Sequence, residues 1–164
     1  MTGLRVAVID DRLDIADGRA SWLRAAGFDV ETLLFEEALE RTAGWDRFDR
    51  ALIDGRDDRP ASHRFGSAEL PDRFLGARVG AHIRDHTDPE SRPVMIVVST
   101  YARTHADLSL RCQESGIDFI FDRAEIGIRE EFAAVVTDPG AHADRTSTSD
   151  REPRPREQAL SLLE

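Results

Sequence analysis

The sequence predicts an α/β domain in which a parallel sheet of five strands carries helices on both of its faces. Short apolar runs recur along the chain, with helix-like segments between them. Such an alternation is typical of doubly wound sheets, and right-handed crossovers leave few possible topologies. The run VMIVVST, residues 94–100, is the most continuously apolar, as expected for a central strand that is covered on both faces.

Local signals place the elements in order. Gly27 ends the first helix, the alternating FDVETL run after it suits an edge strand, and Gly116 ends the fourth helix. In the last helix, Phe132 and Val136 fall on one face. Strands are expected at residues 5–9, 28–33, 48–54, 94–100 and 117–121. Helices are expected at residues 13–26, from 36 onward, and at 73–86, 104–114 and 125–136.

Length and composition fit one domain with a single core. The chain has 164 residues, of which 40% are hydrophobic. Its formal net charge of −10 argues against direct binding of a nucleic-acid backbone or an anionic membrane. The single cysteine, Cys112, rules out an internal disulfide and suits a reducing cytoplasm. No signal peptide and no apolar stretch of membrane-spanning length are evident.

Two segments fall outside the alternating pattern. Residues 55–72 form a polar loop that is longer than usual for such a connection. The alternating pattern ends near residue 137, so we expect a domain at residues 1–137. Residues 138–157 have the Pro, Ser, Asp and Arg composition of a disordered linker, and 158–164 resemble the start of a further helix that leads to an output domain.

Carboxylates follow two of the predicted strands. Asp10 and Asp11 end the first strand, and Asp54 ends the third. Strand ends of this kind meet at one rim of a parallel sheet, where ligands bind. Solvated caps would explain one such aspartate, but an adjacent pair plus a third favours a hard divalent cation such as Mg²⁺.

A hydroxyl group and a positively charged side chain are expected at the same rim. Ser99 lies at the end of the fourth strand and Arg123 at the end of the fifth. Carboxylates, a hydroxyl and a cation together suit phosphoryl transfer. In such chemistry a carboxylate oxygen attacks phosphorus, while the metal and the cation neutralise the transferring oxygens.

With these motifs the chain resembles the receiver domain of bacterial two-component response regulators. The matching stretches are VIDD (8–11), ALID (51–54), IVVSTY (96–101) and GIDFIFDR (116–123), and the resemblance covers about residues 4–136. It implies a flavodoxin-like sheet in the order 2-1-3-4-5. It also implies that Asp54 is the phosphoacceptor, that Asp10, Asp11 and the backbone carbonyl of Arg56 support Mg²⁺, and that Ser99 hydrogen-bonds the phosphoryl group.

The resemblance further implies a regulatory, non-enzymatic role in the cytoplasm. A sensor histidine kinase or another phosphodonor would supply the phosphoryl group. The signal would leave through the face formed by the fourth helix, fifth strand and fifth helix, where two copies would pair as a homodimer. DNA would be bound only by an output module beyond residue 164.

Several positions depart from the family pattern and leave two other function classes open. Arg123 stands where receivers carry lysine, and Asp57 and Asp58 add negative charge after Asp54. A phosphorylation-independent pseudo-receiver would bind a small molecule or a partner protein, with the 55–72 loop as the recognition element. A Mg²⁺-dependent hydrolase with Asp54 as nucleophile would share the carboxylate rim.

Overall fold

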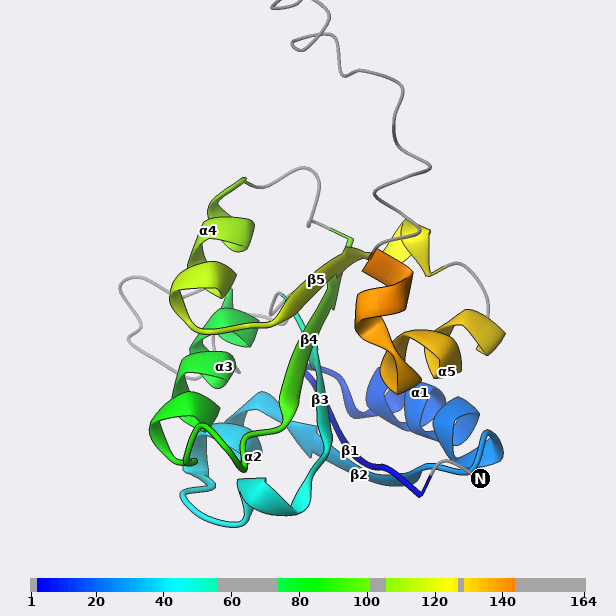
Figure 1. The fold of residues 1–164 in the computed structure, drawn as a ribbon, viewed down its shortest axis with the longest axis horizontal. Helices are drawn as coiled ribbons and strands as arrows, with labels where there is room; N and C mark the ends of the chain where they lie inside the picture. The colour runs from blue at the N-terminus through cyan, green and yellow to red at the C-terminus, as the bar shows by residue number, and fades with distance from the viewer. Residues whose placement is uncertain (1–2, 56–73, 101–105, 127–128, 144–164) are drawn as a thin grey trace, which may run out of the picture.

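The computed structural model describes residues 3–55, 74–100, 106–126 and 129–143 (Figure 1). Within them, parallel strands form one five-stranded sheet in the order β2-β1-β3-β4-β5. The predicted flavodoxin-like fold and strand order are therefore confirmed, with the alternating strand β2 at one edge and the apolar strand β4 inside the sheet. The strands are β1 (Arg5–Asp10), β2 (Asp29–Leu34), β3 (Arg50–Asp54), β4 (Val94–Ser99) and β5 (Phe119–Asp122).

Helices cover both faces of the sheet. α1 and α5 pack on one face, and α2, α3 and α4 pack on the other (Figure 1). Because side chains alternate along a strand, β1 sends Val6 and Val8 toward α1 and α5, and Ala7 and Ile9 toward the opposite layer. The helices are α1 (Leu13–Ala25), α2 (Phe35–Glu40), α3 (Leu75–Asp85), α4 (Ala106–Glu114) and α5 (Arg129–Thr137), with 3-10 turns at Trp45–Arg47 and Arg123–Glu125.

The strands β3 and β5 each begin two residues later than the sequence predicts, because the preceding turn takes up their first residues. The amide of Phe48 donates to the carbonyl of Trp45 at 3.1 Å, which closes a 3-10 turn before β3. The amide of Ile117 donates to the carbonyl of Cys112 at 3.0 Å, which closes the end of α4. Both apolar side chains still reach the core, so the apolar pattern alone extends each strand too far.

The folded part extends past the predicted boundary at residue 137. Residues 139–143 are helical, although they lie in the 138–157 stretch whose composition predicts a linker. His142 is 8% exposed, and its ring meets that of Phe121 edge-on with centroids 5.1 Å apart. This contact adds the segment to the core layer of α1 and α5. Other predicted segments lie outside the described residues. These are the remainder of the 138–157 stretch, residues 158–164, and nearly all of the 55–72 loop.

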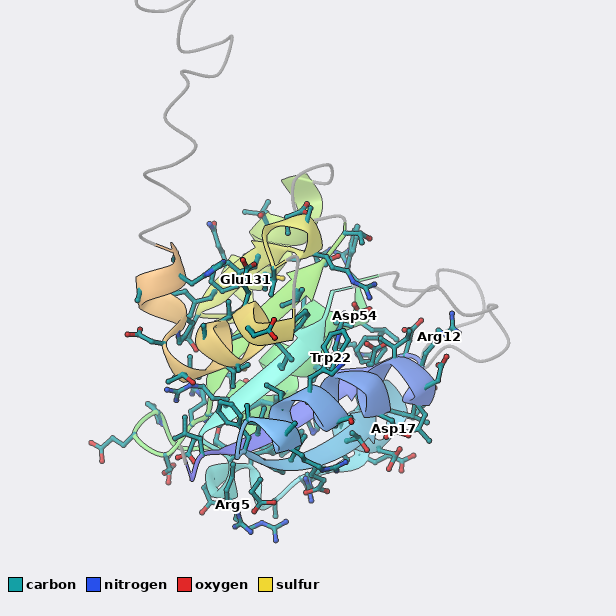
Figure 2. The ribbon with its side chains drawn as sticks, turned by 90° about the vertical axis from the view of Figure 1, so that its right-hand side faces the viewer. Arg5, Arg12, Asp17, Trp22, Asp54 and Glu131 are labelled. Atoms are coloured by element: carbon teal, nitrogen blue, oxygen red, sulfur yellow. The ribbon has the colours of Figure 1, made fainter. Side chains whose placement is uncertain are left out.

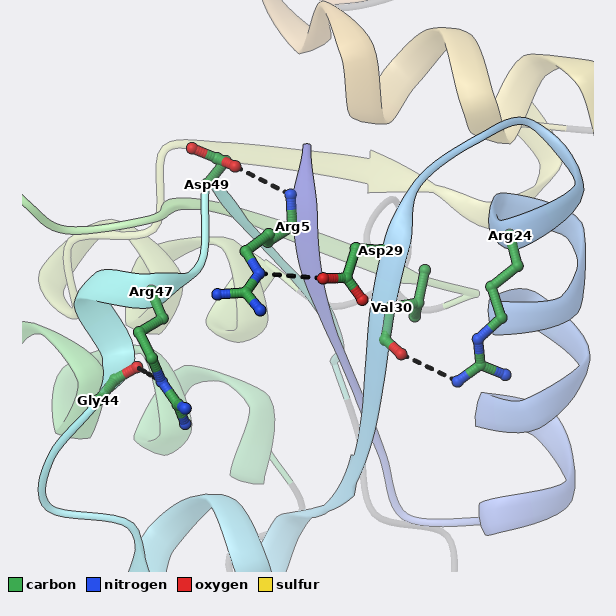
Figure 3. Close-up of polar contacts among 7 residues, drawn as sticks. All are labelled: Arg5, Arg24, Asp29, Val30, Gly44, Arg47 and Asp49. Carbon is green, nitrogen blue, oxygen red and sulfur yellow. Dashed lines mark hydrogen bonds and ion pairs between the residues drawn. The ribbon is translucent and has the colours of Figure 1, made fainter. Parts of the chain in front are cut away.

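Exposed polar contacts, one of them an ion pair, join the amino ends of the strands. The backbone N–H of Arg5 donates to Asp49 Oδ2 at 2.9 Å, and its Nε donates to Asp29 Oδ2 at 3.0 Å (Figure 3). These contacts join the start of β1 to β2 and to the residue before β3. Exposed contacts of this kind contribute little stability.

None of the helices among the described residues combines the length and the apolar character that crossing a membrane would need.

Candidate functional site

Three carboxylates meet at the carboxyl ends of β1 and β3, where the sequence places them. Asp10 is the last residue of β1, Asp11 follows it, and Asp54 is the last residue of β3. These strands are parallel neighbours, and one oxygen from each carboxylate lies within 4.8 Å of the others. Figure 2 shows Asp54 at this end of the sheet and Arg5 at the opposite end. We call Asp10, Asp11 and Asp54 the acidic cluster.

Protein donors hold both oxygens of the Asp10 carboxylate. The backbone N–H of Arg12 donates to Oδ1 at 3.1 Å, where the chain turns from β1 into α1. On the other side, Arg19 Nη1 from α1 donates to Oδ2 at 3.2 Å. Asp10 is 2% exposed, so its carboxylate is buried and held in a fixed orientation.

Burial raises the pKa of Asp10 above its ordinary value. A hydrogen bond with Asp11 lowers this pKa, the charge of Asp54 raises it and the charge of Arg19 lowers it, but the net shift is upward. The ionised form of Asp10 is therefore disfavoured, mainly because the carboxylate is buried and to a lesser degree because Asp54 is near. Three carboxylates at this spacing supply the hard oxygen ligands that Mg²⁺ prefers, so the residues present fit a magnesium site.

Ser99 lies beside the backbone that follows Asp54. It ends β4 and is 2% exposed. A Cβ atom placed on Gly55 would lie 2.7 Å from Ser99 Cβ and 2.9 Å from Ser99 Oγ. Only a glycine after Asp54 leaves room for this serine, and the predicted hydroxyl therefore sits at the same rim as the acidic cluster.

The end of β5 differs in detail from the sequence prediction. The strand β5 continues to Asp122, one residue past the predicted end, and Asp122 pairs in register with Ser99. Asp122 is 9% exposed, and its carboxylate accepts a hydrogen bond from the N–H of Ala124 at 2.9 Å, which caps the 3-10 turn. Arg123 begins that turn with an exposed side chain, and it forms no ion pair with another described residue. The structure thus places Arg123 near the rim but outside the acidic cluster.

Arg19 is the site residue that sequence reasoning missed. It is 3% exposed and lies on the buried face of α1 with Ala16, Ala20 and Leu23. That spacing was a usable signal, because an arginine three residues after one buried alanine and next to another falls on the apolar face. Such a charge is buried only with a partner, and the partner is Asp10.

Other predicted contributors lie outside the described residues. These are the backbone carbonyl of Arg56, the acidic side chains of Asp57 and Asp58, and the remainder of the loop that follows Gly55.

Comparison with known proteins rests on structure alone, since neither a protein-family model nor a curated protein matches this sequence. A CheY-like response regulator receiver domain protein from Methanospirillum hungatei superposes with a TM-score of 0.59 at 18% identity, covering 87% of this chain and 98% of that one. A response regulator protein from Burkholderia pseudomallei, with a phosphorylated aspartic acid and a calcium ion, gives a TM-score of 0.63 at 16% identity, covering 92% and 75%.

A third structure is the receiver domain of the sensor histidine kinase PA1611 from Pseudomonas aeruginosa, with a magnesium ion coordinated in its active site cleft. It gives a TM-score of 0.55 at 18% identity, covering 82% of this chain and 94% of that one. At these identities the likeness concerns the fold. The strand order, the two helical layers and the acidic cluster at the carboxyl rim together identify this chain as having the fold of response regulator receiver domains.

Proposed function

We propose that the chain is a signal-transduction receiver domain in which Asp54 accepts a phosphoryl group with the help of Mg²⁺. The observation that carries this proposal is the convergence of Asp10, Asp11 and Asp54, with one oxygen of each within 4.8 Å of the others, at the rim where ligands of such sheets bind. Ser99 at the same rim adds a hydroxyl donor.

The chemistry is a nucleophilic displacement at phosphorus. A carboxylate oxygen of Asp54 forms a bond to phosphorus as the bond from phosphorus to the leaving group of the donor breaks, and the leaving group takes up a proton. Mg²⁺, when bound, neutralises charge on the phosphoryl oxygens. Asp10 and Asp11 would hold the metal, with the backbone carbonyl of Arg56 as a further ligand. Ser99 and Arg123 would contact the phosphoryl group.

The receiver fold supports a regulatory setting for this chemistry. A sensor histidine kinase or another phosphodonor supplies the phosphoryl group in the cytoplasm, and the domain itself catalyses no turnover of an external substrate. Phosphorylation would change the surface of α4, β5 and α5, through which two copies would pair as a homodimer. An output module beyond the chain would bind DNA.

A second candidate is a pseudo-receiver that keeps the fold and binds a small molecule or a partner protein without phosphorylation. Two observations favour it. Arg19 already supplies a cation to Asp10, and the side chain of Arg123 is exposed rather than turned into the acidic cluster.

Capture of beryllofluoride, a phosphoryl mimic, separates the two candidates. Mg²⁺ is titrated with and without beryllofluoride into the wild type, Asp54→Asn and Asp17→Asn, and binding is followed by tryptophan fluorescence or NMR. Asp17 is an exposed aspartate of α1 and serves as the matched control (Figure 2). A receiver predicts Mg²⁺-dependent capture that only Asp54→Asn abolishes. Absence of capture, or capture that survives in Asp54→Asn, would overturn the proposal.

A further inference from the structure

We propose that Arg19 is a resident cation of the acidic cluster, meaning a positive charge that stays beside Asp10 whether or not a metal is bound. Arg19 then stabilises Asp10 in the metal-free protein and lowers the affinity of the cluster for Mg²⁺. This inference rests on the proposed function in one respect, since it assumes that the acidic cluster is where Mg²⁺ binds. It assigns a role to a side chain of α1, whereas the acidic cluster itself comes from the ends of strands.

The ion pair between Arg19 and Asp10 is almost completely buried. Arg19 Nη1 lies 3.2 Å from Asp10 Oδ2, and the two side chains are 4% and 3% exposed. Arg19 Nε is also buried, and it finds no hydrogen-bond partner among the described residues. Leaving a guanidinium nitrogen unsatisfied costs free energy. The attraction to Asp10 is therefore what keeps this side chain in the interior.

The packing around Arg19 fixes it in this position. Its guanidinium carbon lies 5.8 Å from the centre of the Phe132 ring of α5. Ala16, Ala20 and Leu23 share its face of α1 and are fully buried. The side chain of Arg19 is therefore packed between α1 and α5. The positive charge consequently stays beside Asp10 whether or not a metal is bound.

Charge arithmetic gives the direction of the effect on Mg²⁺. Three ionised carboxylates and one arginine sum to −2, so one divalent cation neutralises the set. Without Arg19 the sum is −3, and the attraction for Mg²⁺ is stronger. Loss of Arg19 does not release Asp10, because the backbone N–H of Arg12 still holds Oδ1 at 3.1 Å. The change in charge therefore outweighs the change in orientation.

The first experiment measures the Mg²⁺ dissociation constant of the wild type, Arg19→Met, Arg19→Lys and Arg24→Met by calorimetry. Methionine is a flexible apolar side chain suited to the buried face of α1. Lysine keeps the charge. Arg24 lies on the same helix, but its Nη2 donates to the Val30 carbonyl at 2.9 Å, away from the acidic cluster (Figure 3).

We expect Arg19→Met to bind Mg²⁺ about tenfold more tightly than the wild type. Arg19→Lys and Arg24→Met should stay within about threefold of the wild type, since one keeps the local charge and the other removes a distant one. Equal or weaker Mg²⁺ binding by Arg19→Met, with its fold intact by circular dichroism, would overturn the inference.

A second experiment needs no metal. The free energy of unfolding is measured in chelator for the wild type, Arg19→Met, Asp10→Asn and the double variant. If Arg19 stabilises Asp10, Arg19→Met is strongly destabilising alone and much less so in the Asp10→Asn background, because no buried carboxylate is then left unpaired. Additive effects of the two substitutions would contradict a resident cation.

The outcomes for the inference and for the proposed function are distinct. Tighter Mg²⁺ binding by Arg19→Met, with coupling in the second experiment, supports the inference. Equal binding by the wild type and Arg19→Met would support a Mg²⁺ site and overturn the inference. Binding by Arg19→Met alone would support the inference and contradict a Mg²⁺-dependent receiver. Binding by neither protein would overturn both.

Discussion

The backbone carbonyl of Asp54 lies directly against Gly76 of α3, and no side chain fits between them. A Cβ atom at Gly76 would collide with the Asp54 carbonyl oxygen and would lie 3.0 Å from the Cα atom of Gly55. The first turn of α3 therefore packs on the strand end that carries the proposed phosphoacceptor. The position of Asp54 thus depends on a glycine more than twenty residues away in the sequence.

Gly76→Ala should destabilise the protein by about 1–3 kcal/mol, because the added methyl group pushes α3 away from β3. Gly18→Ala is the matched control, since Gly18 is also inside a helix but a Cβ atom there meets nothing within 4 Å. That control should stabilise the protein by about 1 kcal/mol through helix propensity. Urea unfolding measures both, and a shift of the same sign for the two variants would refute the close contact.

Asp54→Asn should stabilise the metal-free protein at pH 7 by roughly 1–2 kcal/mol. The reason is that Asp54 shares the acidic cluster with two other carboxylates, and its charge raises the pKa of Asp10. Asp17→Asn, on an exposed part of α1, should change stability little. The measurement is urea unfolding in chelator. A loss of stability in Asp54→Asn would mean that repulsion does not dominate the cluster. Added Mg²⁺ should stabilise the wild type more than Asp54→Asn.

Cys112 should make stability fall at high pH. Burial in α4 raises the pKa of this thiol to about 11, from 9.0 in the unfolded chain. A raised folded-state pKa means that the contribution is fully present below pH 9 and is lost as the pH rises through about 11. Compared with Cys112→Ala, the wild type should therefore lose about 2 kcal/mol between pH 8 and pH 11. A difference between the two proteins that does not vary with pH would show that the thiol is accessible.

The two tryptophans should respond very differently to truncation. Trp45 is fully buried, and its Nε1 donates to the Arg41 carbonyl at 3.0 Å. Trp22 is 38% exposed and packs on Phe132 with ring centroids 5.6 Å apart. Trp45→Ala should cost about 3–5 kcal/mol, and Trp22→Ala should cost about 1 kcal/mol. Similar losses in thermal or urea unfolding would contradict this assignment of core and surface.

Much of the fold and part of the site could be predicted from the sequence. Alternating apolar runs determine the number of strands and their parallel direction, and Asp10, Asp11 and Asp54 follow from where two of those runs end. The strands could be predicted because apolar periodicity is a local property of the sequence. The acidic cluster could be predicted because the carboxyl ends of parallel strands meet at one edge of the sheet.

The remaining features depend on tertiary contacts. The extension of β5 to Asp122, one residue past the predicted end at residue 121, depends on its register with Ser99, which the apolar pattern does not reveal. The spacing of Arg19 puts it on the apolar face of α1, but its pairing with Asp10 follows only from the way α1 packs against β1. His142 is held by Phe121, a contact that composition alone does not reveal.

The central claim is that Asp54 accepts a phosphoryl group. The most direct test is incubation of the protein with acetyl phosphate and Mg²⁺, followed by intact mass measurement and peptide mapping, with Asp54→Asn and a chelated sample as controls. The account predicts the addition of one phosphoryl group, on Asp54, that requires Mg²⁺ and is released by hydroxylamine as an acyl phosphate should be. No gain in mass, or modification of a residue other than Asp54, would contradict it.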